Sequence, residues 1–397
     1  MKIFIAGVDG YLGWTLAQWL ARRGHTVGGA DNFARRSWVK EIGSQSAVPV
    51  AKIHDRLAAF EARYGAPLQF YRGDLSDYEF ARRVLTAFEP DAIVHLGEMP
   101  SAPYSMIDAK HAAYTHTNNL VSTLNMLHLM RDAFPGCHLL KLGTMGEYGT
   151  PNVDIPEGFF NCKLRGREDW MMFPRKPGSF YHATKVHDTY NIEMACRLWG
   201  LRSTDIMQGV VYGTNYWDQE KDERLATRFD FDGVFGTAIN RFCAQAVVGE
   251  PITPFGDGHQ RRGFLPLQDS MQCFTLALEN PPKAGEYRTL NQFEEVYDVT
   301  ELAEKVVEAA GGFRTFKLEP EIRNLCNPRK EAEEHYYNPD CNKLPDLGYV
   351  PAITMAEALH ELIAVLVKHR GRIVACKDAL MPDVRWDGTR GAMEYVK

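Results

Sequence analysis

The sequence lacks several features that would place a chain of its size in a special class. None of its 8 cysteines forms a C-x-x-C pair and no secretory signal opens the chain, so neither a disulfide framework nor a zinc site is expected. The longest uncharged run, between Lys110 and Arg131, carries histidines and asparagines, whereas a membrane span needs about 20 mostly apolar residues. Lys and Arg number 45 against 51 Asp and Glu, and this net charge of -6 argues against non-specific nucleic-acid binding. We therefore expect a cytoplasmic protein without a metal site, a membrane span or a nucleic-acid partner.

The sequence does contain enough apolar material for a core, arranged in alternating segments. Hydrophobic residues make up 45% of the 397 positions, and at roughly 150 residues per domain the length predicts two domains. Strands are predicted at 2–7, 25–31, 68–74, 91–97, 137–143 and 201–211, and helices at 11–24, 52–64, 78–88, 112–134 and 181–199. This β-α-β alternation predicts a doubly wound α/β fold, in which helices cover both faces of a parallel sheet.

The second half of the chain is less regular. Residues 150–178 are rich in Pro and Gly and are predicted to form a long loop, which in a compact domain usually serves function. We predict that residues 1–205 form the doubly wound domain and that residues 206–397 form a smaller α/β domain. Parts of 235–295 are expected to rejoin the first domain.

A glycine-rich turn joins the first predicted strand to the first predicted helix. The glycines of GVDGYLG (7–13) stand at G-x-x-G-x-x-G spacing, which permits a tight turn and lets the backbone approach a pyrophosphate at the helix N-terminus. Asp31 ends the second strand, where a carboxylate accepts hydrogen bonds from the adenosine ribose and repels a 2′-phosphate. The turn therefore predicts a Rossmann-type dinucleotide site and favours NAD, while Arg35 and Arg36 keep NADP open.

A second motif stands on the helix predicted after the strand 137–143. Tyr181 and Lys185 are one helical turn apart and share a face, and Thr144 directly follows the strand. A lysine ammonium beside a phenol lowers the pKa of the phenol, so that the tyrosinate acts as a base. The spacing alone also suits an ordinary amphipathic helix in which Tyr181 packs and Lys185 is solvated; the dinucleotide motif favours the catalytic interpretation.

Further stretches carry a family resemblance along essentially the whole chain. They are GVDGYLGW (7–14), DNFARR (31–36), IHDR (53–56), SAPYSMID (101–108), KLGTMGEYGTPN (141–152), SFYHATKVHD (179–188), QGVVYG (208–213), FDGVFGTAINRFC (231–243), QRRGFL (260–265), NQF (291–293), EAEEHYYN (331–338) and LMPDVRW (380–386). Together they resemble the extended short-chain dehydrogenase/reductases of the nucleotide-sugar epimerase/dehydratase superfamily, and within it the UDP-sulfoquinovose synthases. The TMGEYG and SFYHATKVHD blocks are specific to that branch.

The resemblance implies a role for each matching residue. NAD would be bound by Gly7, Asp9, Gly10, Tyr11, Leu12, Gly13, Asp31, Asn32, Arg35, Asp74, Leu75, Leu96, Asn119, Tyr181, Lys185 and Gln208. The catalytic residues would be Thr144, Tyr181, Lys185 and His182. The nucleotide sugar would be bound by Thr144, Glu147, Gln208, Arg262 and Arg329, because the planar fork of an arginine meets phosphate oxygens in pairs. Without the family context, a solvated surface position would be the default for both arginines. Residues 1–205 would then be the NAD-binding domain and residues 206–397 the nucleotide-sugar-binding domain.

The implied reaction starts with oxidation at C4 of the sugar. Dehydratases that resemble this chain carry Thr-Asp-Glu after the strand, whereas here Thr144 is followed by Met145 and Gly146, with Glu147 one position later. The usual carboxylate pair is absent, which argues against simple dehydratase chemistry. The resemblance implies an NAD-dependent enzyme that converts UDP-glucose and sulfite to UDP-sulfoquinovose through a 4-keto intermediate. His182 is a candidate for proton transfer at C5 or C6, and a buried structural histidine is an equal alternative.

Two departures from the family pattern stand close to the predicted site. Met99-Pro100 replaces Gln-Arg, and Met207-Gln208 replaces Asn-Gln. The first change removes a cation from a loop expected to line the site, where a desolvated sulfite anion would need a partner. Lys163, Arg165 and Arg167 of the predicted loop, or protonated His182, are the candidates for a replacement donor.

Two other functions remain as alternatives. One is a 4-epimerase or dehydratase-type enzyme that acts on a nucleotide-linked hexose without sulfite. The other is a non-catalytic NAD sensor, which the intact set of Thr144, Tyr181 and Lys185 disfavours. As partners we expect the nucleotide sugar, sulfite or a sulfite donor, and a second copy of the chain in a homodimer.

Overall fold

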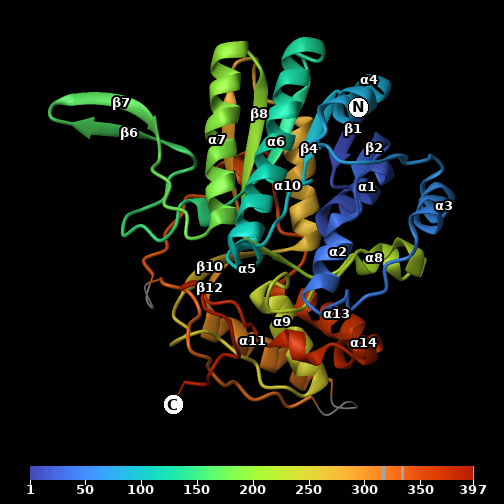
Figure 1. Ribbon diagram of the computed structural model, residues 1–397, viewed down its shortest axis with the longest axis vertical. Coiled ribbons are helices and arrows are strands. Elements are labelled where there is room, and N and C mark those ends of the chain that lie inside the picture. The colour runs from blue at the N-terminus through green and yellow to red at the C-terminus, as the bar shows by residue number, and fades with distance from the viewer. Residues whose placement is uncertain (314–317, 332–334, 397) are drawn as a thin grey trace.

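The computed structural model describes residues 1–313, 318–331 and 335–396, and a large parallel sheet forms its centre (Figure 1). The sheet has 7 strands in the order β11-β8-β5-β4-β1-β2-β3, and every neighbouring pair is parallel. The strands are β1 (Lys2–Ala6), β2 (Thr26–Asp31), β3 (Gln69–Arg72), β4 (Ala92–His95), β5 (His138–Thr144), β8 (Arg202–Gln208) and β11 (Tyr287–Gln292). The strand order reverses between β1 and β4, and ligands of such sheets bind beyond the carboxyl ends of the strands at this point. The expected doubly wound α/β fold is confirmed.

Helices cover both faces of the sheet because alternate residues of each strand point to opposite sides. On one face Ile3 and Ile5 share a buried cluster with α1, α3 and α10, and on the other Phe4 and Ala6 share one with α4, α6 and α7. These helices are α1 (Tyr11–Arg22), α3 (Ile53–Tyr64), α4 (Tyr78–Phe88), α6 (Ala109–Ala133), α7 (Phe180–Trp199) and α10 (Leu267–Glu279). The long helices α6 and α7 lie side by side (Figure 1).

A smaller layer of helices and strands lies in the lower half of Figure 1, near the carboxyl ends of the large sheet's strands. Its helices α9 (Ala238–Val248), α11 (Val299–Gly311), α13 (Met355–Lys368) and α14 (Arg370–Val374) share one buried apolar cluster. Its sheet contains β9 (Val210–Tyr212), β10 (Arg261–Pro266) and β12 (Glu295–Asp298), with β10 parallel to β9 and antiparallel to β12. Along the chain β8 runs to Gln208, and α10 and β11 lie with the large sheet. The division at residues 205 and 206 stays a prediction.

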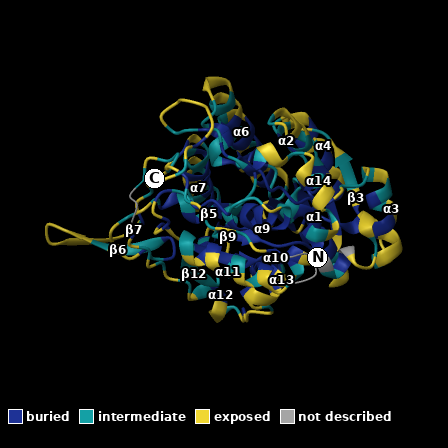
Figure 2. Cartoon of the chain, turned by 90° about the horizontal axis from the view of Figure 1, so that it is seen from below, coloured by how far each residue is buried: buried dark blue, intermediate teal, exposed yellow. Residues whose placement is uncertain are grey.

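The segment predicted as a long loop, 150–178, contains a β-hairpin, so that prediction was wrong. Strands β6 (Phe159–Leu164) and β7 (Arg167–Met172) pair antiparallel and project from the body of the molecule (Figures 1 and 2). The two turn residues, Arg165 and Gly166, both have positive φ, at 48° and 77°, as a tight hairpin turn requires. Most residues of the hairpin are exposed, so the apolar-polar alternation that reveals a half-buried strand is missing from its sequence.

The remaining short elements connect these layers. They are α2 (Ala34–Glu41), α5 (Ala102–Ser105), α8 (Tyr216–Gln219), α12 (Lys343–Asp346) and the 3₁₀ turns η1 (Met145–Glu147), η2 (Glu223–Leu225) and η4 (Lys377–Leu380). Within the described residues, no helix is long and apolar enough to cross a membrane, and no cluster of His, Cys, Asp and Glu side chains could hold a metal ion. All eight cysteines are free.

Candidate functional site

The turn between β1 and α1 has room for backbone only. Gly7 has a φ of 80°, and a Cβ at this residue would lie 2.6 Å from the carbonyl oxygen of Leu96. A Cβ at Gly13 would lie 2.2 Å from the carbonyl oxygen of Gly7. Gly10 begins the 12-residue helix α1 without a side-chain cap, so the first amides of α1 are open to a ligand. The turn is therefore shaped to receive an anionic phosphate group at the helix N-terminus.

Asp31 ends β2 next to this turn. Its carboxylate accepts hydrogen bonds from the amides of Asp9 (2.9 Å) and Phe33 (2.7 Å). Burial, together with the nearby charge of Asp9, raises the pKa of Asp31 to about 6. The two arginines that keep NADP open are both paired with carboxylates: Arg35 with Asp230 at 2.7 Å, and Arg36 with Asp9 at 2.7 Å. This arrangement suits a ribose hydroxyl better than a 2′-phosphate, because Asp31 faces the site and the neighbouring cations are already neutralised.

A single cavity of about 1160 Å³ runs from this turn, past the end of β5, to Trp386. The predicted cofactor residues that line the cavity are Gly7, Gly10, Tyr11, Leu12, Gly13, Asp31, Asn32, Arg35, Asp74, Leu75, Leu96, Tyr181 and Gln208. The predicted catalytic and substrate residues that line it are Thr144, Tyr181, His182, Gln208, Arg262 and Arg329. Pockets for one small ligand usually measure about 300–1,000 Å³. The cavity therefore has room for a dinucleotide and a second ligand together.

Three residues predicted to bind the cofactor do not line the cavity: Lys185 pairs with Glu98, and Asp9 and Asn119 lie behind the cavity wall. The carboxylate of Asp9 pairs with Arg36 and with the fully buried Arg56. The amide of Asn119 accepts a hydrogen bond from Met99 N (2.8 Å) and donates one to Thr184 Oγ1 (3.0 Å). Both side chains hold the segments that form the wall, and the sequence motif alone gives no sign of which way they turn.

Glu147, predicted to bind the sugar, also faces the interior. It is fully buried, and its carboxylate caps η1 by accepting a hydrogen bond from Thr144 N at 3.3 Å. The ammonium of Lys141 lies 3.7 Å from one of its oxygens, and Thr189 donates to the other at 3.0 Å. Burial raises the pKa of Glu147, although Lys141 opposes that effect. In this structure Glu147 supports the turn under Thr144 and does not reach the cavity.

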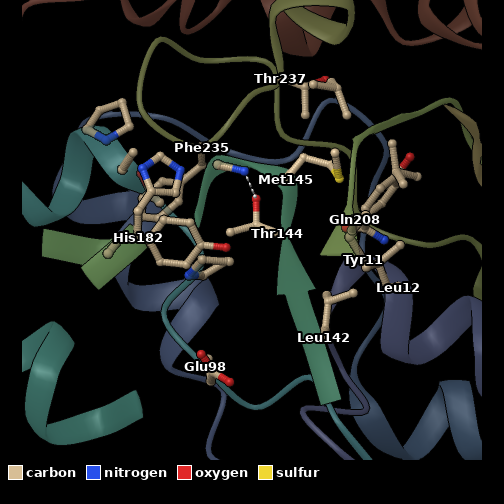
Figure 3. A pocket seen from close by; sticks show the side chains of 18 of the residues that line it. Tyr11, Leu12, Glu98, Leu142, Thr144, Met145, His182, Gln208, Phe235 and Thr237 are labelled. Carbon is tan, nitrogen blue, oxygen red and sulfur yellow. Dashed lines mark hydrogen bonds between the residues drawn. The ribbon is translucent and has the colours of Figure 1, made fainter. Parts of the chain in front are cut away.

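Thr144 and Tyr181 face the cavity together. Thr144 stands at the carboxyl end of β5, where its hydroxyl accepts a hydrogen bond from Gly146 N at 3.1 Å (Figure 3). The hydroxyl hydrogen of Thr144 is therefore available to a ligand. Tyr181 lies in the first turn of α7, and the amide of Tyr181 donates to Ser105 Oγ at 3.0 Å. The two elements thus bring a hydroxyl and a phenol to the same place, as the motif spacing predicted.

Lys185 does not act on Tyr181 in the way the sequence suggested. Its ammonium lies 5.9 Å from the centre of the Tyr181 ring and only 2.8 Å from the carboxylate of Glu98. Burial, followed by the charges of Glu98 and Glu147, raises the pKa of Tyr181. In the cofactor-free protein the pKa of the phenol is therefore raised and not lowered as expected, chiefly because Tyr181 is buried and secondly because of the two carboxylates.

His182 packs against the turn that follows β5. A Cβ at Gly146 would come within 2.4 Å of His182 Nε2, and Ser179 Oγ lies 3.0 Å from His182 Nδ1. Burial, with the charges of Arg329 and Arg262 nearby, lowers the pKa of His182 to about 3. The imidazole is therefore neutral at pH 7, so His182 does not supply the positive charge that would bind an anion in place of the missing arginine.

The second end of the cavity carries the two arginines that the resemblance assigned to the nucleotide. Arg262 on β10 donates to Glu331 at 2.8 Å and lies 2.7 Å from His335 Nδ1. The guanidinium of Arg329 lies 5.2 Å from the centre of the Trp386 ring. The chain thus brings Arg262, Arg329 and the C-terminal segment together although they are far apart in sequence.

The loop after β4 contains Met99 and Pro100, which replace the Gln-Arg of the family pattern, and only one of the two residues faces the cavity. Met99 is fully buried in an apolar cluster with Tyr104 and Phe235, whereas Pro100 is exposed and lines the cavity. The proposed replacement donors Lys163, Arg165 and Arg167 lie on the projecting hairpin and do not line the cavity, which corrects that expectation. Two lysines do line the cavity, Lys176 and Lys330.

Several lining residues were missed by the sequence argument. They are Trp38, Glu98, Arg228, Phe235, Arg241, Phe255, Gln260, Tyr337 and Trp386, among others. Only Glu98 carried a local signal, because it comes shortly after the strand β4, near the carboxyl ends of the strands where Thr144 ends β5. The others reach the cavity through long-range packing that no local pattern encodes.

Comparison with known proteins places this architecture in a family. The profile of the NAD dependent epimerase/dehydratase family matches residues 3–291. The chain belongs to that family. Membership confirms the expected superfamily and confirms NAD as the cofactor. It also confirms that the protein is an NAD-dependent enzyme that acts on a nucleotide sugar.

Two relatives of this epimerase/dehydratase family member cover nearly all of its chain. A UDP-sulfoquinovose synthase from Sulfolobus acidocaldarius is 47% identical over 387 residues, which are 97% of this chain and 98% of the relative. A chloroplastic UDP-sulfoquinovose synthase from Spinacia oleracea is 44% identical over 385 residues, which are 97% of this chain and 79% of the relative. The similarity thus extends well beyond the nucleotide-binding turn into the smaller layer.

Solved structures of sugar epimerases share the fold. A UDP-glucose 4-epimerase from Thermotoga maritima aligns with a TM-score of 0.68 and 21% identity, covering 93% of this chain and 99% of that one. A UDP-glucuronic acid 4-epimerase from Bacillus cereus aligns with a TM-score of 0.69 and 19% identity, covering 93% and 99%. At this level of identity the alignments support the arrangement of the two layers and nothing finer.

Proposed function

We propose that this protein is an NAD-dependent UDP-sulfoquinovose synthase, which converts UDP-glucose and sulfite to UDP-sulfoquinovose through a 4-keto sugar. The observation that carries the proposal is the 47% identity, over 97% of the chain, to a UDP-sulfoquinovose synthase. The cavity supports it, because one space is lined both by the glycine turn and by Thr144 and Tyr181.

The residues at the first end of the cavity fit NAD. The uncapped N-terminus of α1 and the glycine turn would hold the pyrophosphate, and Asp31 would accept hydrogen bonds from the adenosine ribose. Leu96 lies against Gly7 of this turn, and Asn32, which follows Asp31, donates a hydrogen bond to Asp74 at 3.1 Å. When bound, NAD would supply a reversible hydride acceptor for C4 of the sugar.

Tyr181 and Thr144 would carry the proton of the first step. The phenol oxygen of Tyr181 would take the proton of the sugar 4-hydroxyl. The hydroxyl group of Thr144 would donate a hydrogen bond to the oxygen at C4 and so hold it in place. Lys185, held behind Tyr181, would supply the positive charge that stabilises a tyrosinate.

His182 would then act as a base at C5. The 4-keto group acidifies the C5 proton, and the imidazole that packs on Gly146 would accept it, although burial keeps its basicity low in the cofactor-free protein. The C6 hydroxyl leaves with a proton as water, which gives a 5,6-enone. The sulfur lone pair of sulfite would add at C6, C5 would regain a proton, and return of the hydride to C4 would complete the product.

Cations at the second end would hold the anionic parts of the substrates. Arg262 and Arg329 would grip the diphosphate, with Arg262 exchanging its Glu331 contact for phosphate oxygens. Lys176 and Lys330 line the same cavity and are exposed, so they are the candidates to receive sulfite. Gln208 lines the wall between the two ends.

The paired helices α6 and α7 support a homodimer. They expose six large side chains, Tyr114, Leu124, Phe180, Tyr190, Met194 and Leu198. A second copy that packs the same two helices against these residues would bury them by twofold symmetry. Eight free cysteines suit a reducing compartment, and we propose the cytoplasm.

The second candidate function is a 4-epimerase or dehydratase-type enzyme that does not use sulfite. The observation that favours it is Pro100, which offers the cavity no charged donor. The two functions share their first step and differ in the product. Mass spectrometry of the product from a panel of nucleotide sugars, with and without sulfite, separates them: a sulfonated hexose supports the synthase, and an unsulfonated product unaffected by sulfite supports the alternative.

A further inference from the structure

A buried ion pair lies behind Tyr181. The ammonium of Lys185 is 2.8 Å from a carboxylate oxygen of Glu98, and the two side chains are 3% and 2% exposed. The same ammonium donates a hydrogen bond to the carbonyl oxygen of Leu142 on β5. Figure 3 shows Glu98 at the inner end of the cavity, below Thr144 and His182. The pair therefore stands between the sheet and the proposed catalytic phenol.

Lys185 is the main compensation for the Glu98 carboxylate: its charge, with smaller contributions from His95 and Lys141, opposes the effect of burial and lowers the pKa of Glu98. Among the described residues, no donor meets the geometry of a hydrogen bond to either Glu98 oxygen. His95 lies 3.7 Å away, but burial lowers the pKa of His95 to about 4, so its imidazole is neutral at pH 7. A buried ion pair is nevertheless a weak source of folding stability, because both charges must be removed from water. Its presence calls for a role in the site.

The other charged groups around the pair are already neutral or paired. On α7, burial and the charge of Glu98 raise the pKa of Asp188 well above its usual range, which favours the neutral form of Asp188. On β5, Lys141 lies 3.7 Å from both Glu147 and Asp205. On α2, the remaining cation that acts on Tyr181, Arg35, is paired with Asp230. The Glu98 carboxylate is thus the principal charge that opposes Lys185 near Tyr181.

We propose that Glu98 is a positioning residue whose carboxylate fixes the Lys185 ammonium and sets the pH range over which Tyr181 works as a base. The proposal rests on the catalytic roles proposed for Tyr181 and Lys185. The geometry supports a double effect: Glu98 holds the ammonium in one place, and its negative charge cancels part of the field that would otherwise stabilise a tyrosinate. Removal of the charge with the shape kept should therefore favour the tyrosinate.

The test is the pH dependence of the first step in wild type and Glu98→Gln. The rate of NADH formation is measured by absorbance in single turnovers with UDP-glucose at a series of pH values. In Glu98→Gln, the part of the profile where the rate rises with pH is expected to move to lower pH by about one unit or more. In the cofactor-free protein, the NMR signal of ¹³C-labelled Tyr181, assigned by its loss in Tyr181→Phe, should show more tyrosinate at pH 11 in Glu98→Gln than in wild type. Glu79→Gln, which removes an exposed carboxylate paired with Arg82, should change neither readout.

An unshifted pH profile and an equal tyrosinate fraction in folded Glu98→Gln would overturn the proposal. If Glu98→Gln does not fold, Glu98→Asp is the test, because its carboxylate keeps the negative charge but lies one methylene farther from Lys185. In Glu98→Asp the rate is expected to rise over the same pH range as in wild type but to be at least about tenfold lower. A rate equal to that of wild type at every pH would overturn the positioning role. The NMR titration needs no substrate, so it separates failure of this proposal from failure of the proposed function.

Discussion

The imidazole of His182 lies directly on Gly146, so closely that a Cβ at Gly146 would come within 2.4 Å of Nε2. The ring cannot retreat easily, because Ser179 holds Nδ1 at 3.0 Å. The residue after Met145 must therefore be a glycine if His182 is to face C5 of the sugar.

Gly146→Ala is expected to lower the rate of product formation at least about tenfold while NAD binding is unchanged, because the new methyl group displaces a positioned proton acceptor. Steady-state rates and calorimetry with NAD measure the two effects. Gly178→Ala is the matched control, since a Cβ there would meet Trp386 at an ordinary 3.5 Å. Equal rates in Gly146→Ala and wild type would remove His182 from the mechanism.

Arg262→Ala and Arg329→Ala should each weaken binding of the nucleotide sugar by about tenfold or more, through loss of a charge-assisted contact to the diphosphate. NAD affinity should stay the same. The comparison is Arg261→Ala, because Arg261 precedes Arg262 on β10 but is exposed and outside the cavity wall. Calorimetry on each ligand decides, and weakening of both ligands or of neither contradicts the assignment.

Asp31→Asn should stabilise the cofactor-free protein in a pH-dependent way. The folded protein raises the pKa of Asp31 to about 6, so its ionised form costs stability above that pH. The cost disappears as the pH falls toward about 4, where the carboxyl is protonated in the unfolded chain too. The unfolding temperature of the variant relative to wild type should therefore be highest at pH 7 and decline by pH 4.

The same substitution should weaken NAD binding, since Asp31 is proposed to accept hydrogen bonds from the ribose. Asp346→Asn, at an exposed position on α12, is the control for both measurements. A stability difference that stays constant between pH 7 and pH 4 would show that Asp31 is not the titrating group.

Pro100→Arg should lower the KM for sulfite by at least about fivefold, because it returns a cation to the cavity wall. Met99→Gln should not help and should destabilise the fold, since Met99 is fully buried in an apolar cluster. Initial rates against sulfite concentration give the KM. An unchanged KM in Pro100→Arg would mean that another donor, such as Lys176, already receives the anion.

The sequence predicted six of the seven strands of the large sheet, and the glycine turn after the first of them, because both depend on local patterns. The glycine spacing and Asp31 lie within one β-α-β unit, so strand and helix periodicity places them correctly. Tyr181 and Thr144 were found for the same reason. The hairpin β6–β7 was missed because its exposed strands show no alternation.

Side-chain direction was beyond the reach of the sequence. Glu147 and Asn119 follow the family motifs, yet they turn behind the wall to cap a turn and hold a loop. The state of Lys185 on α7 depends on Glu98, which comes from the loop after β4 and pairs with it only in the folded protein. Charge compensation of this kind is set by tertiary packing and has no local sequence signature.

The most direct test of the account is incubation of the purified enzyme with UDP-glucose, NAD and ³⁴S-labelled sulfite, followed by mass spectrometry of the nucleotide sugars. The account predicts a new UDP-hexose that carries one labelled sulfonate, absent from a parallel reaction with Tyr181→Phe. Consumption of UDP-glucose to a product without the label, at a rate that sulfite does not change, would contradict it.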